Sequence, residues 1–150
     1  MKLAKHLIAL MLPVAVAGCQ LGADGDGAAR EVARDWADAY FNCDYKDALN
    51  YVTPESEKYL RFAASNTTEH DLELLRERPA EIAVLDDFTE ANDTLRVVTL
   101  QVRNVLSADI MAKEPQLIES GTFLVTVVRR DGKWRVRMEG LPRSGTQSPY

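Results

Sequence analysis

The hydrophobic period of the sequence changes once, at Pro79, and this change constrains the fold more than any other feature. Before Pro79, apolar residues recur every three or four positions, the spacing that gives an α-helix one apolar face. After Pro79, segments rich in Val, Leu, Ile, Thr and aromatic residues alternate with polar residues, which is typical of strands. Helices followed by strands predict an α+β domain, with N-terminal helices packed on a four-stranded antiparallel sheet.

Four helices are expected before Pro79. The first spans residues 28–42, and its apolar side chains form one stripe: Ala29, Val32, Ala33, Trp36, Ala37, Tyr40 and Phe41. Asp44 is expected to cap a short second helix. Thr53 and Pro54 indicate the start of a third, because threonine offers a capping oxygen and proline suits the first turn. Thr68 is expected to cap a fourth, which ends before Pro79.

Four strands are expected after Pro79, at residues 80–88, 94–106, 121–130 and 133–139. Asp131-Gly132 lies between the last two and predicts a two-residue hairpin turn, because glycine tolerates a positive φ. Residues 105–120 have no clear pattern, and one interpretation extends both neighbouring strands around a loop at 112–115.

The N-terminus has the features of a secretory signal. Lys2 and Lys5 precede an apolar run of eleven residues, 7–17, which is shorter than the about 20 residues that a membrane-spanning helix needs. The run ends in Val16-Ala17-Gly18-Cys19, which resembles a bacterial lipobox. The alternative is a plain secretory signal with an incidental cysteine.

The resemblance to a lipobox implies that residues 1–18 are removed and that Cys19 carries a diacylglyceryl group and an amino-terminal acyl chain such as palmitate. Two or three acyl chains anchor a protein firmly. The residue after Cys19 is Gln20 and not the Asp that retains lipoproteins in the inner membrane. The expected location is therefore the outer membrane, if the organism is Gram-negative.

The remaining chain divides into a tether, one domain and a tail. Residues 19–27 comprise the lipidated cysteine and a glycine-rich spacer, 28–140 the domain and 141–150 a loose tail. Without residues 1–18 the chain has 16 basic and 23 acidic residues, a net charge of −7. This charge argues against nucleic acid as a partner and leaves the lipid anchor to hold the protein at the membrane.

Three segments resemble the nuclear-transport-factor-two-like superfamily, which has the cystatin-like cone fold. They are Val32-Ala33-Arg34-Asp35-Trp36, then Asp44-Tyr45-Lys46-Asp47-Ala48 with Tyr51-Val52-Thr53-Pro54-Glu55, and finally Asp131-Gly132-Lys133-Trp134-Arg135-Val136. The resemblance covers about residues 28–140, is greatest to small bacterial lipoproteins of unknown function, and implies a curved sheet.

The resemblance implies a pocket between the sheet and the helices, but fold alone does not decide function. Some members bind small apolar ligands, some are isomerases or dehydratases, and many mediate protein contacts. The pocket would be lined by aromatic residues: Trp36, Tyr40, Tyr45, Tyr51, Phe123 and Trp134. The competing interpretation is that these side chains only fill the core, which their periodic spacing already explains.

An enzyme of this type would need a carboxylate whose pKa is raised by burial, beside a tyrosine donor. The candidates are Asp35, Asp86 and Asp87, with Tyr40 or Tyr45. The pattern around them is also typical of solvated acids. No spacing of His, Cys, Asp or Glu indicates a metal site, and no glycine-rich loop indicates a nucleotide, so no cofactor is expected.

Two further residues have candidate roles. Cys43 is the only thiol besides Cys19 and is expected to be a buried residue at a helix end, with a reactive thiol or an intermolecular bridge as alternatives. Asp93-Thr94-Leu95 resembles an O-glycosylation acceptor used by one Gram-negative phylum, which makes Thr94 a candidate attachment site.

Together these features predict a membrane-anchored lipoprotein of the bacterial envelope. We expect it to be non-enzymatic and to bind a small apolar ligand or a partner protein of the envelope. A small isomerase or dehydratase is the alternative. A homodimer through the open sheet face, with Leu95 and Val97 in the contact, is a further possibility implied by the resemblance.

Overall fold

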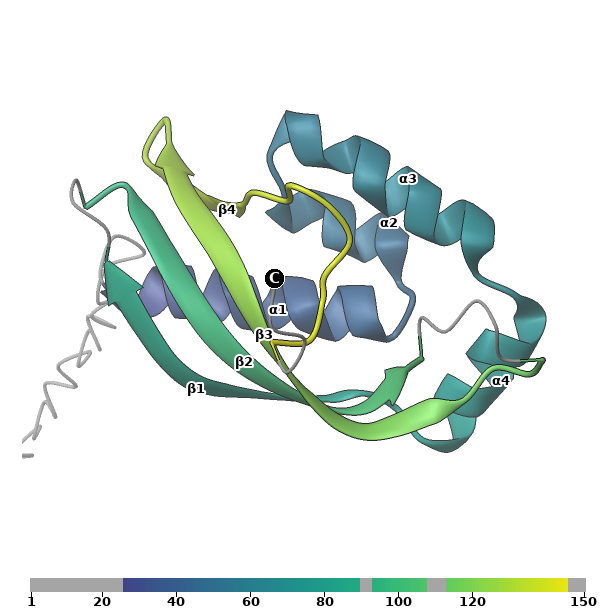
Figure 1. The fold of residues 1–150 in the computed structure, drawn as a ribbon. Coiled ribbons are helices and arrows are strands. Elements are labelled where there is room, and N and C mark those ends of the chain that lie inside the picture. Colours follow the sequence, from purple (N-terminus) through teal and green to yellow (C-terminus); the bar gives the residue numbers. More distant parts are fainter. Residues whose placement is uncertain (1–25, 90–92, 108–112, 146–150) are drawn as a thin grey trace, which may run out of the picture.

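Four helices and four strands follow one another along the chain, with every helix before the first strand (Figure 1). The computed structural model describes residues 26–89, 93–107 and 113–145. The helices are α1 (Asp26–Phe41), α2 (Tyr45–Ala48), α3 (Glu57–Asn66) and α4 (Glu69–Glu77), with 3₁₀ turns at Leu49–Tyr51 and Pro54–Ser56. The strands are β1 (Glu81–Thr89), β2 (Leu95–Leu106), β3 (Leu117–Arg130) and β4 (Lys133–Val136). The predicted α+β class is confirmed.

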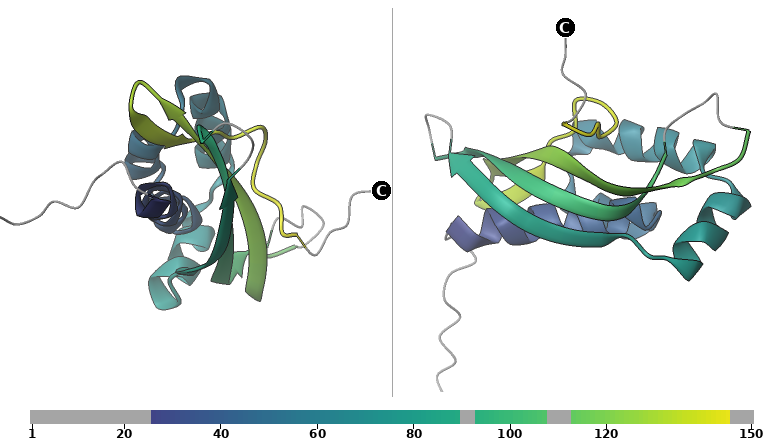
Figure 2. Two further views of the ribbon diagram at one scale, coloured as in Figure 1. Left: turned by 90° about the vertical axis from the view of Figure 1, so that its left-hand side faces the viewer. Right: turned by 60° about the horizontal axis from the view of Figure 1, so that its bottom comes forward.

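The four strands form one antiparallel sheet in the order β1-β2-β3-β4. The sheet curves around α1, and the helices lie on one face of it (Figure 2). We call this the inner face and the opposite one the outer face. A β-bulge at Leu85 shifts the register of β1 against β2. As a result Asp87 follows Val84 on the inner face, while Asp86 is exposed.

Small residues let α1 approach the inner face closely. Ala29, Ala33 and Ala37 are fully buried along the helix, and Trp36 fills the space beside them. The strands complete the core with buried residues at alternate positions: Val98, Leu100, Val102, Phe123, Val125, Val127, Trp134 and Val136. The alternation of apolar and polar residues that is expected of these strands is therefore confirmed at these positions.

The expected helix starts are confirmed at Asp44 and Thr68, and at Thr53 a 3₁₀ turn with Pro54 in its first turn leads into α3, but without the expected side-chain cap. The Asp44 carboxylate accepts a hydrogen bond from the Asp47 N–H, and Thr68 forms a reciprocal capping box with Asp71. The Thr53 hydroxyl caps nothing, because it is buried and hydrogen-bonded to the Ser56 hydroxyl at 2.8 Å.

The predicted hairpin at Asp131-Gly132 is present, with φ of 51° and 74° at its two residues. The interpretation of 105–120 as extended strands is also confirmed for the described residues, because Leu106 pairs with Leu117; residues 108–112 lie outside them.

Strand β4 ends at Val136, three residues before the expected end. Arg137 still donates its N–H to the Thr126 carbonyl, at 2.9 Å. The next N–H, of Met138, turns away from β3 and bonds the buried Ser56 hydroxyl at 2.8 Å. This bond draws the chain off the sheet.

Candidate ligand-binding site

The C-terminal segment, residues 137–145, leaves β3 and returns to it. It is held at its start by the Arg137 N–H on the Thr126 carbonyl and at its end by the Gly145 N–H on the Thr122 carbonyl, at 2.6 Å. Alternate residues of an antiparallel strand present their backbone N–H and C=O groups on the same edge. The backbone groups of Leu124 therefore face the gap between these two bonds. In the described part of the chain, Leu124 has no backbone partner on that edge. The segment thus encloses a gap beside β3.

A pocket of about 310 Å³ lies in this gap, which we call the segment pocket. Its residues come from three parts of the chain: Trp36 of α1, 124–126 of β3, and 136–143. Its inner wall is apolar, because Trp36, Val125 and Val136 belong to the core and are buried. The segment itself supplies the outer rim, including Glu139, Leu141 and Arg143.

Within residues 26–89, 93–107 and 113–145, two polar side-chain atoms of the lining residues are buried without a hydrogen-bond partner. They are the indole Nε1 of Trp36, a residue that is 2% exposed, and Nε of Arg137. Both atoms are hydrogen-bond donors only. Buried donors are normally satisfied, so an unpaired donor in a pocket residue is a feature that a bound acceptor would complete.

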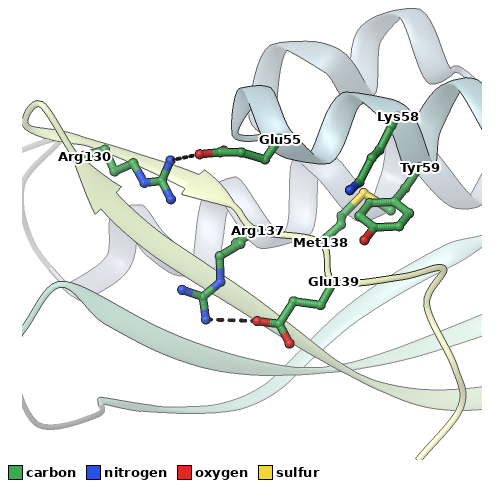
Figure 3. Close-up of a pocket in the computed structure, with 7 residues that line it drawn as sticks. All are labelled: Glu55, Lys58, Tyr59, Arg130, Arg137, Met138 and Glu139. Carbon is green, nitrogen blue, oxygen red and sulfur yellow. Dashed lines mark hydrogen bonds and ion pairs between the residues drawn. The ribbon is translucent and has the colours of Figure 1, made fainter.

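A second, charged hollow of about 260 Å³ adjoins the segment pocket and shares Arg137, Met138 and Glu139 with it (Figure 3). Arg130 pairs with Glu55 across it at 2.6 Å, and this guanidinium lowers the pKa of the Glu55 carboxyl to about 2. Arg137 Nη2 lies 3.3 Å from the Glu139 carboxylate, and both side chains lie on the rim.

The six aromatic residues expected to line a pocket lie mainly within or against the core. Trp36, Phe123 and Trp134 are buried, and Tyr40, Tyr45 and Tyr51 are half-buried beside them. The rings of Trp36 and Tyr40 stack with centroids 5.1 Å apart, and the Phe41 and Phe123 centroids are 4.7 Å apart. Trp36 is the member of this set that lines the segment pocket.

The three candidate carboxylates do not lie together. Asp35 pairs with Arg34 at the surface, at 2.9 Å, and Asp86 is exposed. Asp87 lies on the inner face, where its carboxylate is 2.8 Å from Arg96 and 3.3 Å from Arg30. Within the described residues, no hydrogen bond joins any of the three to Tyr40 or Tyr45. The arrangement around Asp87 is that of a largely buried ion pair with Arg96.

The tyrosine candidates are held in apolar surroundings near Cys43. Burial raises the pKa of Tyr40 to about 12 and also raises the pKa of Tyr45. The Tyr45 hydroxyl lies 3.4 Å from Cys43 Sγ and 3.0 Å from the Thr67 hydroxyl. Cys43 follows α1 with a positive φ of 62° and is half-buried, and burial raises the pKa of its thiol.

The remaining site predictions concern the ends and turns of the molecule. Cys19 and residues 1–18 lie outside the described residues. Thr94 is exposed immediately before β2 and stays a candidate for modification. No helix in the described ranges is long and apolar enough to cross a membrane. Nor do three or more His, Cys, Asp or Glu side chains gather as metal ligands there.

The segment pocket is the feature that sequence reasoning missed. The sequence assigns residues 136–143 partly to a strand and partly to a loose tail. Neither interpretation predicts that they line a pocket. Gly140 and Pro142 are the signal that a strand could not continue through this stretch. The return of the chain to β3 has no signal in the local sequence. It depends on the backbone hydrogen bond from the Gly145 N–H to the carbonyl of Thr122, a residue far earlier in the sequence.

Comparisons with known proteins find solved structures that are loosely similar to this chain, among them the following two. No protein-family model and no curated protein matches the chain. Rv3472, a protein of unknown function from Mycobacterium tuberculosis, is similar with 15% identity over 82% of this chain and 78% of that one, at a TM-score of 0.45. An NTF2-like protein involved in plasmid conjugation is similar with 16% identity over 80% of this chain, at a TM-score of 0.32. This chain spans 48% of that second protein, and the α+β architecture rests on the elements described above.

Proposed function

We propose that the protein is a lipid-anchored binding protein of the bacterial envelope, and that its domain holds a small apolar ligand in the segment pocket. The observation that most supports ligand binding is the position of Trp36. This core residue lines the pocket, and its buried indole N–H has no partner in the described part of the chain. The observation that supports the lipid anchor is the lipobox-like sequence that ends at Cys19.

The segment pocket has the volume of a small-molecule site. Such sites have volumes of about 300–1,000 Å³, mostly apolar walls and a few polar groups that orient the ligand. The segment pocket, at about 310 Å³, lies at the small end of this range. Its wall of Trp36, Val125 and Val136 is apolar, and the unpartnered donors of Trp36 and Arg137 supply the polar points.

Native mass spectrometry of the protein released from its own envelope tests the ligand. We expect an additional mass of a few hundred daltons on the intact chain. In Trp36→Phe an aromatic ring remains but the indole N–H donor is lost, and we expect the additional mass to decrease strongly. Trp134→Phe is the matched control, because Trp134 is also buried with an unpartnered indole N–H but does not line the pocket. Equal retention by both variants would contradict the pocket.

The anchor is tested separately by the intact mass and by membrane fractionation. We expect the mature chain to begin at Cys19, to carry two or three acyl chains and to sediment with the membranes. Cys19→Ser removes the acylated sulfur and should release the protein into the soluble fraction. A mature chain that starts elsewhere, or an unmodified Cys19, would contradict the lipid anchor.

A protein partner on the outer face is the second candidate function. Phe88 and Leu124 are 51% and 62% exposed there, and Val97 lies between Phe88 and Thr126 in the register. Apolar side chains gathered on an uncovered sheet face are a feature of contact surfaces. A second copy of this chain is one such partner. Cross-linking in the envelope would favour this function if it captures a discrete complex that Phe88→Ser abolishes.

A further inference from the structure

Two buried side-chain donors belong to residues that line the segment pocket, and they constrain the ligand. Trp36 Nε1 and Arg137 Nε are buried and have no hydrogen-bond partner among the described residues, and neither an indole N–H nor a guanidinium N–H can accept a hydrogen bond. A ligand made only of hydrocarbon would leave both donors unsatisfied. A ligand that completes the pocket must therefore bring at least one acceptor.

The charges on the rim favour an anionic acceptor. Arg137 and Arg143 line the segment pocket, and Glu139 is the one acidic residue among the described residues of its lining. Arg143 has no ion-pair partner in the described part of the chain. In the adjoining hollow, Arg130 is neutralised by Glu55 (Figure 3). The segment pocket thus presents a net positive rim above an apolar wall.

The pair between Arg137 and Glu139 can yield to a ligand. The two groups are 3.3 Å apart, and the Glu139 side chain is 79% exposed. Ion pairs in such exposed positions contribute little to stability. A carboxylate entering the pocket can form a charge-assisted hydrogen bond with the same guanidinium, which also has its buried Nε to offer.

We infer that the segment pocket takes a small apolar monocarboxylate. Its hydrocarbon body would lie against Trp36, Val125 and Val136, and its carboxylate would meet Arg137, with the Trp36 indole as a second donor. This inference rests on the proposed function and specifies the chemical class of its ligand.

The test compares octanoate with 1-octanol by isothermal titration calorimetry at pH 7. The protein is the full chain with Cys19→Ser, so that no acyl chain competes for the pocket. We expect octanoate to bind about tenfold more tightly than 1-octanol, because a hydrogen bond to a charged group is worth about a factor of ten or more. In Arg137→Gln the affinity for octanoate should fall to that for 1-octanol, while the affinity for 1-octanol is unchanged.

Arg130→Gln is the matched control, since Arg130 lines the adjoining hollow and not the segment pocket. It should leave both affinities unchanged. If 1-octanol binds as tightly as octanoate, the ligand is apolar but not anionic, and this inference is overturned while the proposed function stands. If neither compound binds the parent chain, this inference and the proposed ligand-binding function are both overturned. An equal loss of octanoate binding in Arg130→Gln and Arg137→Gln would overturn the assignment to Arg137.

Discussion

Ser56 shows how one buried hydroxyl determines where the segment pocket opens. Its oxygen accepts from the Met138 N–H and bonds the Thr53 hydroxyl, so that two polar groups are satisfied in the interior. Ser56→Ala leaves the Met138 N–H unpaired and should lower the free energy of unfolding by about 1–3 kcal/mol. Ser65→Ala, at an exposed position in α3, is the control and should change it by less than about 0.5 kcal/mol. Urea denaturation followed by circular dichroism measures both, and equal effects would contradict a role for the buried bond.

Asp87 and Asp86 are adjacent in sequence but differ in environment. The Asp87 and Arg96 side chains are only 10% and 11% exposed, and Arg96 lies over the Trp134 ring. Asp87→Asn removes the carboxylate charge that lies 2.8 Å from the Arg96 guanidinium and should lower the free energy of unfolding by about 3 kcal/mol. Asp86→Asn should have little effect. Urea denaturation measures both variants. An equal loss of stability in the two would contradict a stabilising role for the ion pair.

Cys43 should react slowly as a nucleophile. Burial disfavours the thiolate and raises the pKa of this thiol, so a smaller fraction is ionised at a given pH than in the unfolded chain. Alkylation by iodoacetamide, followed by mass spectrometry in the Cys19→Ser chain, should reach half its maximal rate at a higher pH in the native protein than in urea. The same pH midpoint in both states would mean that the thiol is not buried.

The sequence predicts residue environments only where the local pattern is regular. It identifies the inward residues of β2 and β3 from Val98 to Val102 and from Phe123 to Val127, because buried residues occupy every second position in these two stretches. It fails at Asp87, because the bulge at Leu85 places this residue on the inner face, while Asp86 is exposed as the pattern of solvated acids predicts. A bulge of this kind depends on pairing with β2, which no local window of the sequence contains.

At the scale of elements, the hairpin between β3 and β4 depends on one glycine. Gly132 has a φ of +74°, and a side chain there would be strained even though nothing lies within 4 Å. Gly132→Ala should lower the free energy of unfolding by about 1–2 kcal/mol. Gly140→Ala is matched, since Gly140 also has open space around it but no positive φ. Thermal denaturation distinguishes the two variants. If Gly132→Ala were as stable as the parent protein, the turn would not be formed as described.

Element boundaries were predictable where a capping residue or a tight turn lies in the sequence itself. Asp44, Thr68 and Asp131-Gly132 are such signals, and the structure has them in these roles. The end of β4 was not predictable, because it depends on a bond between Met138 and Ser56, 82 residues apart. The segment pocket exists because of this bond, so local patterns could not have revealed it.

At the scale of the whole molecule, the two sides of the sheet have different surroundings. The helices cover the inner face, and the core there is filled by α1 and the strands (Figure 2). The space for a ligand lies at the edge of β3, beneath the C-terminal segment. In the proposed account, the lipid anchor confines the domain to the envelope and this edge site holds the ligand.

The most direct test of the account is to observe the two tryptophan indole N–H groups by ¹H–¹⁵N NMR during a titration with octanoate. The chain has two tryptophans, so their signals can be assigned with Trp36→Phe and Trp134→Phe. The account predicts that the Trp36 indole signal shifts progressively as it gains an acceptor, while the Trp134 signal stays in place. A Trp36 signal that does not move at saturating octanoate would contradict it.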